Sequence, residues 1–325
     1  MNSPLQWDTD GKHWPHREAS HFVHAEGLRW HTQQFGFHND AKNETLGEAL
    51  TSQRPIALLI HGTGASTHSW RDLVPLLEPH FKLLAIDLPG HGFTGMPLSE
   101  ANSNQFTLPG MAQAIGGLLQ SLKLKPALIV GHSAGAAIGV RMCLDGLAAP
   151  KALVSLNGAF LQLGGLAGRL FSPAAKFMAA VPLVPQLFSW RAADPSVLLK
   201  LMDGTGSKLN DEGLALYQKL VSNPGHAAGA LRMMANWDLL ALTRDLPTLK
   251  TPLCLVVGAI DRTIPPQQAS QVKALMTQSC VSKVTLTNLP GLGHLAHEER
   301  PDLAAQVILE QFELAFSTPR ATTQG

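Results

Sequence analysis

Short apolar runs alternate along this chain with longer stretches whose apolar residues recur at helical spacing. Runs of about four to eight residues are typical of parallel strands that are buried on both faces. The pattern predicts strands at 56–60, 81–86, 127–130, 152–156, 252–257 and 283–287, and helices near 69–78, 108–122, 134–147, 266–277 and 299–316. We therefore expect an α/β fold with a mostly parallel central sheet and helices on both faces.

Three polar segments border this alternation. Residues 1–20 predict an extended N-terminal arm, 38–54 predict a loop, and 319–325 predict a flexible tail. Between the arm and the loop, 22–25 and 28–36 alternate apolar and polar positions, as an antiparallel hairpin does. The hairpin is expected to lead into the sheet.

The alternation stops between residues 158 and 247, where Leu, Met, Phe and Pro predict short helices broken by prolines. We expect this segment to be a helical cap, inserted into a core made of 21–157 and 248–318. An apolar cap would wall a substrate pocket. The expected pocket residues are His132, Phe160, Phe171, Phe177, Phe188, Trp190 and Trp237. Contact of the cap with a membrane surface or a partner protein stays open as a further role.

Residues 131–135 read Gly-His-Ser-Ala-Gly and lie directly between a predicted strand and a predicted helix. In that context Gly-x-Ser-x-Gly is typical of a nucleophile elbow, a tight turn that exposes the serine hydroxyl above the sheet edge. The glycines Gly131 and Gly135 leave room for the helix to pack close to the strand. A chance match in a loop is the alternative, but the flanking elements argue against it. Ser133 is the candidate nucleophile.

A serine hydroxyl needs a base to remove its proton and a carboxylate to orient that base. With this elbow the chain order is Ser, then Asp or Glu, then His. Asp261 follows the predicted strand 252–257, and His294 ends the Gly-rich turn after 283–287. Both lie at carboxyl ends of parallel strands, where α/β sheets carry ligand-handling groups. The predicted triad is Ser133, Asp261 and His294, with a helix N-cap as the alternative role of Asp261.

Other polar residues fit these roles less well. Asn157 follows the strand 152–156 but cannot carry the charge that steadies an imidazolium, and Asp238 lies in the predicted cap. His294 and His297 could be metal ligands, but His-Leu-Ala-His lacks the glutamate of His-Glu-x-x-His, and no third ligand motif follows. We expect neither a metal nor a cofactor.

The loop 61–64, after the strand 56–60, reads His-Gly-Thr-Gly. A tetrahedral intermediate needs preorganised donors for its oxyanion, and in this architecture two backbone N–H groups supply them. We expect these donors at Thr63 and Ala134. The loop also begins like a dinucleotide fingerprint, but Thr67 stands where the third glycine belongs. A single Gly-x-Gly is weak evidence, so the sequence does not favour a nucleotide.

Composition narrows the class of protein. The chain has 325 residues, a formal net charge of +1 and 45% hydrophobic residues, enough for one large core with an inserted subdomain. Near-neutral charge gives no reason to expect nucleic acid as a partner. The cysteines Cys143, Cys254 and Cys280 read as reduced core thiols, and no leader or membrane-spanning stretch is evident. These features predict a cytoplasmic protein, peripheral at the membrane if the cap docks there.

The motifs resemble those of α/β-hydrolase-fold serine hydrolases over nearly the whole chain. Two further motifs are much more specific, Trp-Pro-His-Arg-Glu-Ala-Ser at 14–20 and Met-Met-Ala-Asn-Trp-Asp-Leu at 233–239. Through them the chain more closely resembles the BchO-type magnesium-chelatase accessory proteins of bacteriochlorophyll biosynthesis. The other segments that carry the resemblance are 61–72, 87–94, 130–137, 155–159 and 291–301.

This resemblance implies a role near the insertion of magnesium into protoporphyrin, with magnesium chelatase as a partner and a tetrapyrrole as a ligand. It does not supply a reaction. One function left open is a Ser-His-Asp hydrolase acting on an ester of a large apolar substrate, such as a tetrapyrrole ester. Another is a non-catalytic accessory protein that holds a porphyrin or docks on the chelatase. A weaker third is a carbon–carbon or peroxidase-type hydrolase that uses the same triad.

Overall fold

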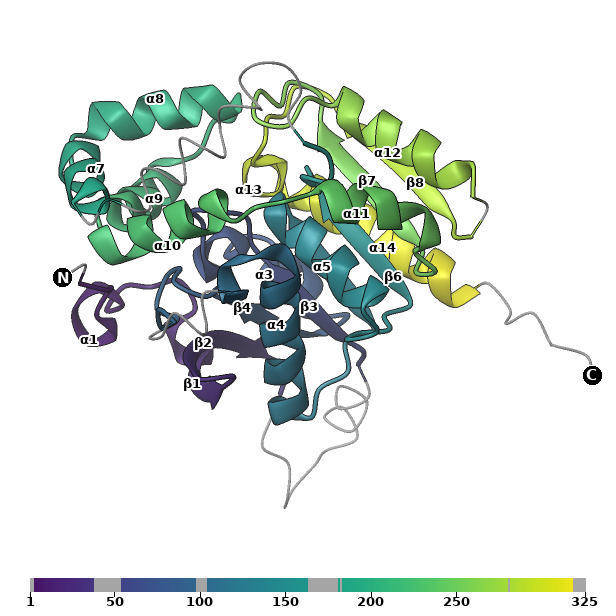
Figure 1. Ribbon diagram of the computed structural model, residues 1–325, viewed down its shortest axis with the longest axis horizontal. Coiled ribbons are helices and arrows are strands. Elements are labelled where there is room, and N and C mark those ends of the chain that lie inside the picture. Colours follow the sequence, from purple (N-terminus) through teal and green to yellow (C-terminus); the bar gives the residue numbers. More distant parts are fainter. Residues whose placement is uncertain are drawn as a thin grey trace, which may run out of the picture.

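A mostly parallel sheet forms the centre of the molecule (Figure 1). The computed structural model describes residues 3–37, 54–97, 104–162, 181, 183–279 and 281–317. The strands, in chain order, are β1 (Ser20–Ala25), β2 (Leu28–Phe35), β3 (Ile56–Ile60), β4 (Lys82–Ile86), β5 (Leu128–His132), β6 (Ala152–Leu156), β7 (Leu253–Gly258) and β8 (Val284–Leu289). They lie side by side in the order β1-β2-β4-β3-β5-β6-β7-β8. Only the pairs β1–β2 and β2–β4 are antiparallel.

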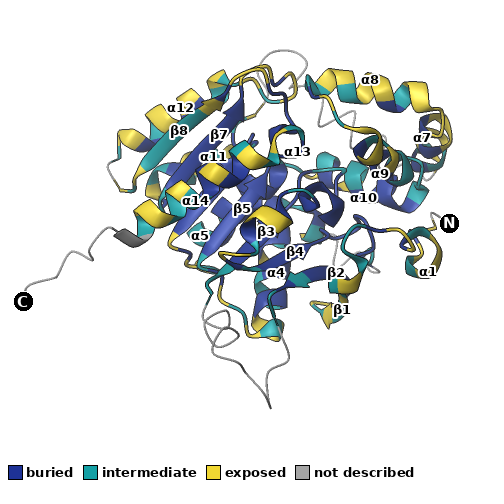
Figure 2. Cartoon of the chain, turned by 180° about the vertical axis from the view of Figure 1, so that it is seen from behind, coloured by how far each residue is buried: buried dark blue, intermediate teal, exposed yellow. Residues whose placement is uncertain are grey.

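Both faces of the sheet are covered, as the unbroken apolar runs predicted. In β3, Leu58 and Ile60 belong to one buried cluster, whereas Ala57 and Leu59 belong to another, because successive side chains alternate across a strand. The first cluster includes residues of α4 (Leu108–Leu122), α5 (Ala134–Leu144) and α12 (Gln267–Thr277), and the second includes residues of α3 (Val74–Leu77) and α14 (Pro301–Ser317). Figure 2 shows the buried strands between these layers.

Prolines account for the two places where a predicted helix is divided. The helix expected near 69–78 is a 3₁₀ turn at Thr67–Trp70 followed by α3, and the one near 299–316 is α13 (Ala296–Glu299) followed by α14. Pro75 and Pro301 stand in the first turn of α3 and α14. A proline cannot donate to the preceding turn, so a helix starts there more readily than it continues. The helix 108–122 and the strands 56–60 and 152–156 match their predicted bounds.

The cap helices follow β6 and precede β7 in the chain, and they lie over the carboxyl ends of the strands (Figure 1). They are α7 (Val184–Ala192), α8 (Pro195–Thr205), α9 (Asp211–Val221), α10 (Pro224–Ala235) and α11 (Leu240–Asp245), and the 3₁₀ turn Leu246–Thr248 follows them. Side chains of Asp194, Asn210 and Asn223 cap α8, α9 and α10 by accepting backbone N–H bonds. This satisfies donors that every helix start leaves unpaired. Short helices interrupted by prolines were expected here.

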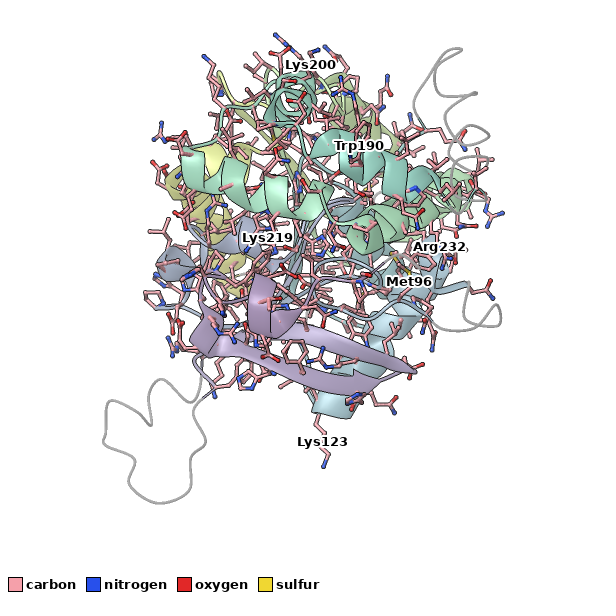
Figure 3. The ribbon with its side chains drawn as sticks, turned by 90° about the vertical axis from the view of Figure 1, so that its left-hand side faces the viewer. Met96, Lys123, Trp190, Lys200, Lys219 and Arg232 are labelled. Atoms are coloured by element: carbon pink, nitrogen blue, oxygen red, sulfur yellow. The ribbon has the colours of Figure 1, made fainter. Side chains whose placement is uncertain are left out.

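The N-terminal segment is packed against the cap, which corrects the expectation of an extended arm. It contains α1 (Trp7–Asp10) and a 3₁₀ turn at Arg17–Ala19. Leu5 and Trp14 are buried in one apolar cluster with Leu216 and Leu220 of α9. Lys219 of α9 also donates to the carbonyl of Asp10 (2.6 Å; Figure 3 labels Lys219). Burial of these apolar side chains outweighs the polar character of the rest of the segment.

The structure also describes two of the three cysteines and the apolar character of the helices. Cys143 and Cys254 are free thiols, and burial raises the pKa of each to about 11. Cys280 and the tail 319–325 lie outside the described residues. In the part of the chain that the structure describes, no helix has both the length and the apolar character needed to cross a bilayer.

Candidate active site

The turn from β5 into α5 presents Ser133 in a strained backbone conformation. Its φ of 52° and ψ of −117° lie in a region that a residue with a side chain seldom occupies. Two glycines make the turn possible: a Cβ on Gly135 would lie 2.0 Å from the Ile60 carbonyl oxygen, and one on Gly131 would lie 2.5 Å from Ala136 Cα. The turn therefore has the geometry of a nucleophile elbow, with glycines where helix and strand meet.

His294 and Asp261 form a buried hydrogen-bonded pair. The Nδ1 atom of His294 lies 2.7 Å from Oδ2 of Asp261, and both side chains are less than a tenth exposed. An ionised carboxylate can only accept, so Nδ1 carries the proton. In the neutral imidazole, Nε2 is then free to act as a base. The sequence placed both residues in loops at one sheet edge, and the structure brings them into contact.

Asp261 also organises the loop in which it lies. Its Oδ1 accepts N–H bonds from Thr263 (2.7 Å) and Ile264 (2.9 Å). The helix α12 begins only at Gln267, so these bonds cap a turn of the loop rather than the helix. The helix N-cap that was the alternative role for Asp261 is therefore not observed: one oxygen holds a turn of the loop, and the other faces His294.

Asn157 is a residue of the site that sequence reasoning missed. Its Nδ2 donates to Asp261 Oδ2 (2.8 Å) and to the Gly293 carbonyl (3.3 Å). Asn157 is buried and has a φ of 49°. It was set aside because it cannot replace the carboxylate, but its place directly after β6 puts it at the same sheet edge as Asp261. That position was the available signal for a partner of the carboxylate.

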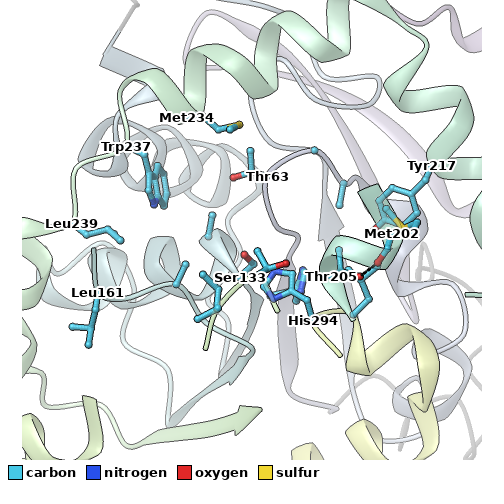
Figure 4. Close-up of a pocket in the computed structure, with 18 of the residues that line it drawn as sticks. Thr63, Ser133, Leu161, Met202, Thr205, Tyr217, Met234, Trp237, Leu239 and His294 are labelled. Carbon is cyan, nitrogen blue, oxygen red and sulfur yellow. Dashed lines mark hydrogen bonds between the residues drawn. The ribbon is translucent and has the colours of Figure 1, made fainter. Parts of the chain in front are cut away.

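A cavity of about 620 Å³ opens in front of the elbow, and Ser133, His294, Thr63 and Ala134 all line it (Figure 4). Ala134 is the first residue of α5, so its N–H has no acceptor within the helix. Among the described residues of the wall, none is Asp, Glu, Lys or Arg. The cavity thus combines the predicted nucleophile, base and oxyanion donors with an otherwise uncharged lining.

Only some of the expected pocket residues line this cavity. His132 and Trp237 do, whereas Phe160 is buried in the core, and Phe171 and Phe177 lie outside the described residues. Phe188 and Trp190 are 38% and 73% exposed and are not among the described residues that line the cavity; Figure 3 labels Trp190 on the cap. This corrects their expected place. The inner face of α7 consists of Pro185, Ser189 and Ala192, so the aromatic residues are left on its outer face.

Two further buried histidines, His132 and His297, lie beside the predicted triad. His132 Nε2 donates to the carbonyl oxygen of His294 (3.0 Å), and burial keeps the pKa of His132 well below its usual value. The ring of His297 packs between His132 and Trp70, with ring centroids 4.4 and 4.9 Å away. Burial lowers the pKa of His297 to about 3. Both imidazoles therefore stay neutral near neutral pH and support the His294 loop.

A buried ionic group connects the cap with the core. Glu298 accepts from Arg71 Nη1 (2.7 Å) and from the hydroxyl of Tyr217 (2.8 Å), which belongs to α9. Burial raises the pKa of Glu298 to about 7. Tyr217 also lines the cavity, so this contact holds one wall of the cavity against the core.

Comparison with known proteins gives a consistent result. A family described as the alpha/beta hydrolase family matches residues 57–307. The chain is 36% identical over 259 residues, 80% of its length, to the magnesium-chelatase 30 kDa subunit of Rhodobacter capsulatus, of which 87% is covered. It is 26% identical over 70% of its length to the pimeloyl-[acyl-carrier protein] methyl ester esterase of Vibrio vulnificus, of which 84% is covered.

Solved structures share the same architecture. A putative lipase from Acinetobacter baumannii superposes with a TM-score of 0.73 at 18% identity, covering 98% of this chain and 99% of that protein. A serine hydrolase involved in carbazole degradation superposes with a TM-score of 0.67 at 18% identity, covering 91% of this chain and 98% of that one. At such identities the likeness is one of fold.

Proposed function

The chain belongs to the alpha/beta hydrolase family, and from this premise we propose that it is a serine hydrolase that cleaves an ester bond of a large apolar substrate. The single observation that carries the proposal is the arrangement around one cavity. There a strained Ser133 and the base His294, hydrogen-bonded to Asp261, share an uncharged wall. Packing alone does not explain why the carboxylate of Asp261 is buried and hydrogen-bonded. The carboxylate does stabilise His294, the base, which must become positively charged during the reaction.

In the proposed reaction, His294 Nε2 takes the proton of Ser133 while Oγ forms a bond to the ester carbonyl carbon. The N–H groups of Thr63 and Ala134 hold the oxyanion, and Asp261 stabilises the imidazolium. The intermediate expels the alcohol, which receives the proton from His294. Water then attacks the acyl-enzyme, gives its proton to His294, and releases the acid as the proton returns to Ser133.

We propose a tetrapyrrole ester as the substrate class to test first, because of the similarity to the magnesium-chelatase 30 kDa subunit. The cavity has a volume of about 620 Å³ and a mainly apolar lining, which supports a large apolar ligand of that kind. In this proposal the segment 158–247 acts as the cap that covers the ligand, while 21–157 and 248–318 carry the triad.

The proposal is tested by intact-mass analysis after treatment with a fluorophosphonate probe. The parent protein should gain one adduct, and Ser133→Ala and His294→Ala should gain none, because the first lacks the nucleophile and the second lacks its base. Circular dichroism and thermal melting show whether both variants are folded. A folded parent that gains no adduct would contradict an activated Ser133.

The second candidate is a non-catalytic accessory protein that holds a porphyrin or docks on magnesium chelatase, and the name of the 36% identical relative favours it. In a strain whose own copy of the gene is deleted, this candidate predicts that Ser133→Ala restores pigment synthesis as well as the parent does. The hydrolase proposal predicts no restoration at equal protein level. The same strain therefore separates the two.

Peripheral contact of the cap with a membrane belongs to this proposal as well. Leu183, Leu187 and Trp190 are 70%, 63% and 73% exposed along one side of α7, and such side chains insert into a lipid interface. Sedimentation with vesicles of anionic and neutral phospholipid tests it. Binding that persists in a Leu187→Ser, Trp190→Ser double variant would argue against this surface.

A further inference from the structure

The wall of the cavity is built from two separate apolar clusters. Tyr217 and Leu295 belong to one, with Met202 and Val221 packed against it; we call this the histidine-side wall. Leu239 belongs to the main core cluster, with Leu161 and Trp237 packed against it; we call this the tryptophan-side wall. In Figure 4 the labelled members of the two walls lie on opposite sides of Ser133.

Hydrogen bonding places His294 on the first of these walls. The backbone N–H of His294 donates to the carbonyl of Thr205 (3.1 Å), and Thr205 also donates through its hydroxyl to the carbonyl of Met202 (2.6 Å). Leu295, the next residue, is itself a member of the wall. The imidazole thus projects from the surface that Met202 and Tyr217 continue.

Acyl transfer at a serine fixes which half of an ester lies against which wall. The base that removes the serine proton must deliver it to the leaving oxygen, so that oxygen lies beside the imidazole in the intermediate. The alcohol half continues from this oxygen, and the acyl half continues from the carbonyl carbon on the far side of Ser133. The oxyanion itself is directed to the N–H groups of Thr63 and Ala134.

Neither wall contains a charged side chain among its described residues. Among the described residues of the cavity wall there is no Lys, Arg, Asp or Glu, and the Tyr217 hydroxyl is already committed to Glu298. A free carboxylate that rests on the apolar side chains of either wall would lose its hydration without gaining a cationic partner among the described residues, which costs several kcal/mol. We therefore expect both halves to be uncharged where they touch these side chains.

We propose, on the basis of the hydrolase function above, that the substrate is a neutral ester with apolar groups on both sides. The tryptophan-side wall selects the acyl group, and the histidine-side wall selects the alcohol. Trp237 and Met202 are the specificity-determining residues of the two halves. An acid that carries a second, free carboxylate at the far end of its acyl chain is a poor substrate, so among tetrapyrrole esters those with every carboxyl group esterified are the ones that fit.

The experiment measures kcat/KM for two series of esters with the parent and two variants. One series varies the acyl chain from acetate to decanoate on a single alcohol, and the other varies the alcohol from methanol to octanol on hexanoate. Trp237→Ala should lower kcat/KM for decanoate relative to acetate by about tenfold and leave the alcohol series unchanged. Met202→Ala should do the reverse. Leu199→Ala, at a position that is 54% exposed and not among the described residues of the cavity wall, is the matched control.

A third comparison tests the charge argument. The parent should hydrolyse methyl octanoate at least about tenfold better than the monomethyl ester of octanedioic acid, because the latter places a carboxylate on the wall. Equal rates for these two esters would overturn the inference of uncharged walls. The assignment of the walls would be overturned if each variant changed both ester series equally. It would also be overturned if Trp237→Ala changed only the alcohol series and Met202→Ala only the acyl series.

These outcomes are separable from failure of the proposed function. If the parent hydrolyses esters and Ser133→Ala does not, the hydrolase proposal is supported. The Trp237→Ala and Met202→Ala variants then test only which wall holds the acyl group and which holds the alcohol. If the folded parent neither reacts with the fluorophosphonate nor hydrolyses any ester, the hydrolase proposal fails and this inference fails with it.

Discussion

At the scale of single residues, the two carboxylate oxygens of Asp261 have different partners: one binds its own loop, and the other binds His294. One oxygen accepts from Thr263 and Ile264, and the other accepts from His294 and Asn157. In Asp261→Asn an amide would face the Nδ1–H of His294 and could not stabilise an imidazolium. We expect kcat to fall by about 10⁴-fold. Burst kinetics with an activated ester measure it, and a loss below tenfold would remove Asp261 from the triad.

His297 allows a prediction about acid stability. Burial holds its pKa at about 3, against an ordinary value of 6.5, and its ring nitrogens have no hydrogen-bond partner among the described residues. The unfolded chain therefore binds a proton below about pH 6.5 that the folded chain refuses, so stability is lost as pH falls. At about pH 5 this loss is about 2 kcal/mol.

His297→Phe keeps the ring between Trp70 and His132 but removes the titrating group. We expect the free energy of unfolding to drop about 2 kcal/mol less than in the parent between about pH 7.5 and pH 5. Urea titrations at the two pH values measure it. Identical drops in parent and variant would show that His297 is protonated in the folded state. The other buried histidines, such as His91 and His226, leave part of the slope in both proteins.

The residue scale also shows where sequence reasoning reached its limit. Ser133, Asp261 and His294 could be proposed because motif and chain order place each after a strand, and all such strands end at one edge. Phe188 and Trp190 were misplaced because the composition of a short apolar helix does not say which face is buried. The buried residues of α7, which contacts α10, are Pro185, Ser189 and Ala192 instead.

At the scale of elements, one glycine governs how closely the cap approaches the core. A Cβ on Gly229, in α10, would lie 2.0 Å from the carbonyl oxygen of Gly90. Alanine is the better helix former by about 1 kcal/mol, but here the clash with a backbone atom dominates. We expect Gly229→Ala to lower the free energy of unfolding by about 1–3 kcal/mol, measured by urea denaturation.

Gly204 is the matched control, because it also lies in a cap helix, α8, and a Cβ there would have nothing within 4 Å. Gly204→Ala should raise the free energy of unfolding by roughly 0.5–1 kcal/mol. Two glycine-to-alanine changes in the cap should thus have opposite signs. Equal effects would mean that α10 does not approach Gly90 as closely as described.

Elements were predicted better than their boundaries and packing. The strands of the parallel region were evident from their unbroken apolar runs, since both faces of such strands are buried. Helix ends were displaced where proline intervened, as at Pro75 and Pro301. The pairing of α9 with the N-terminal segment was not predictable, because it joins residues about two hundred positions apart with no shared local pattern.

At the scale of the whole molecule, Trp14 joins the N-terminal segment to core and cap. It is 3% exposed, its Nε1 donates to Thr67 Oγ1 (3.2 Å), and it shares a cluster with Leu216 and Leu220. We expect Trp14→Ala to cost about 3–5 kcal/mol and to speed hydrogen exchange in α9. Trp190→Ala, at an exposed position, should change stability by less than about 0.5 kcal/mol. Unchanged exchange in α9 would show that the segment does not hold the cap.

The strands β6 and β7 are neighbours in the sheet although the whole cap lies between them in the chain. Because the two strands are parallel, that insertion leaves the carboxyl edge of the sheet and must return to the amino edge, about one strand length away, roughly 17 Å, whatever length of chain connects them. Doubling such a connection costs only about 0.6 kcal/mol of closure entropy. Evolution can thus lengthen, shorten or exchange this segment while the sheet keeps its register. Relatives can then differ in the substrate they accept without any change at the sheet edge that carries Ser133, Asp261 and His294.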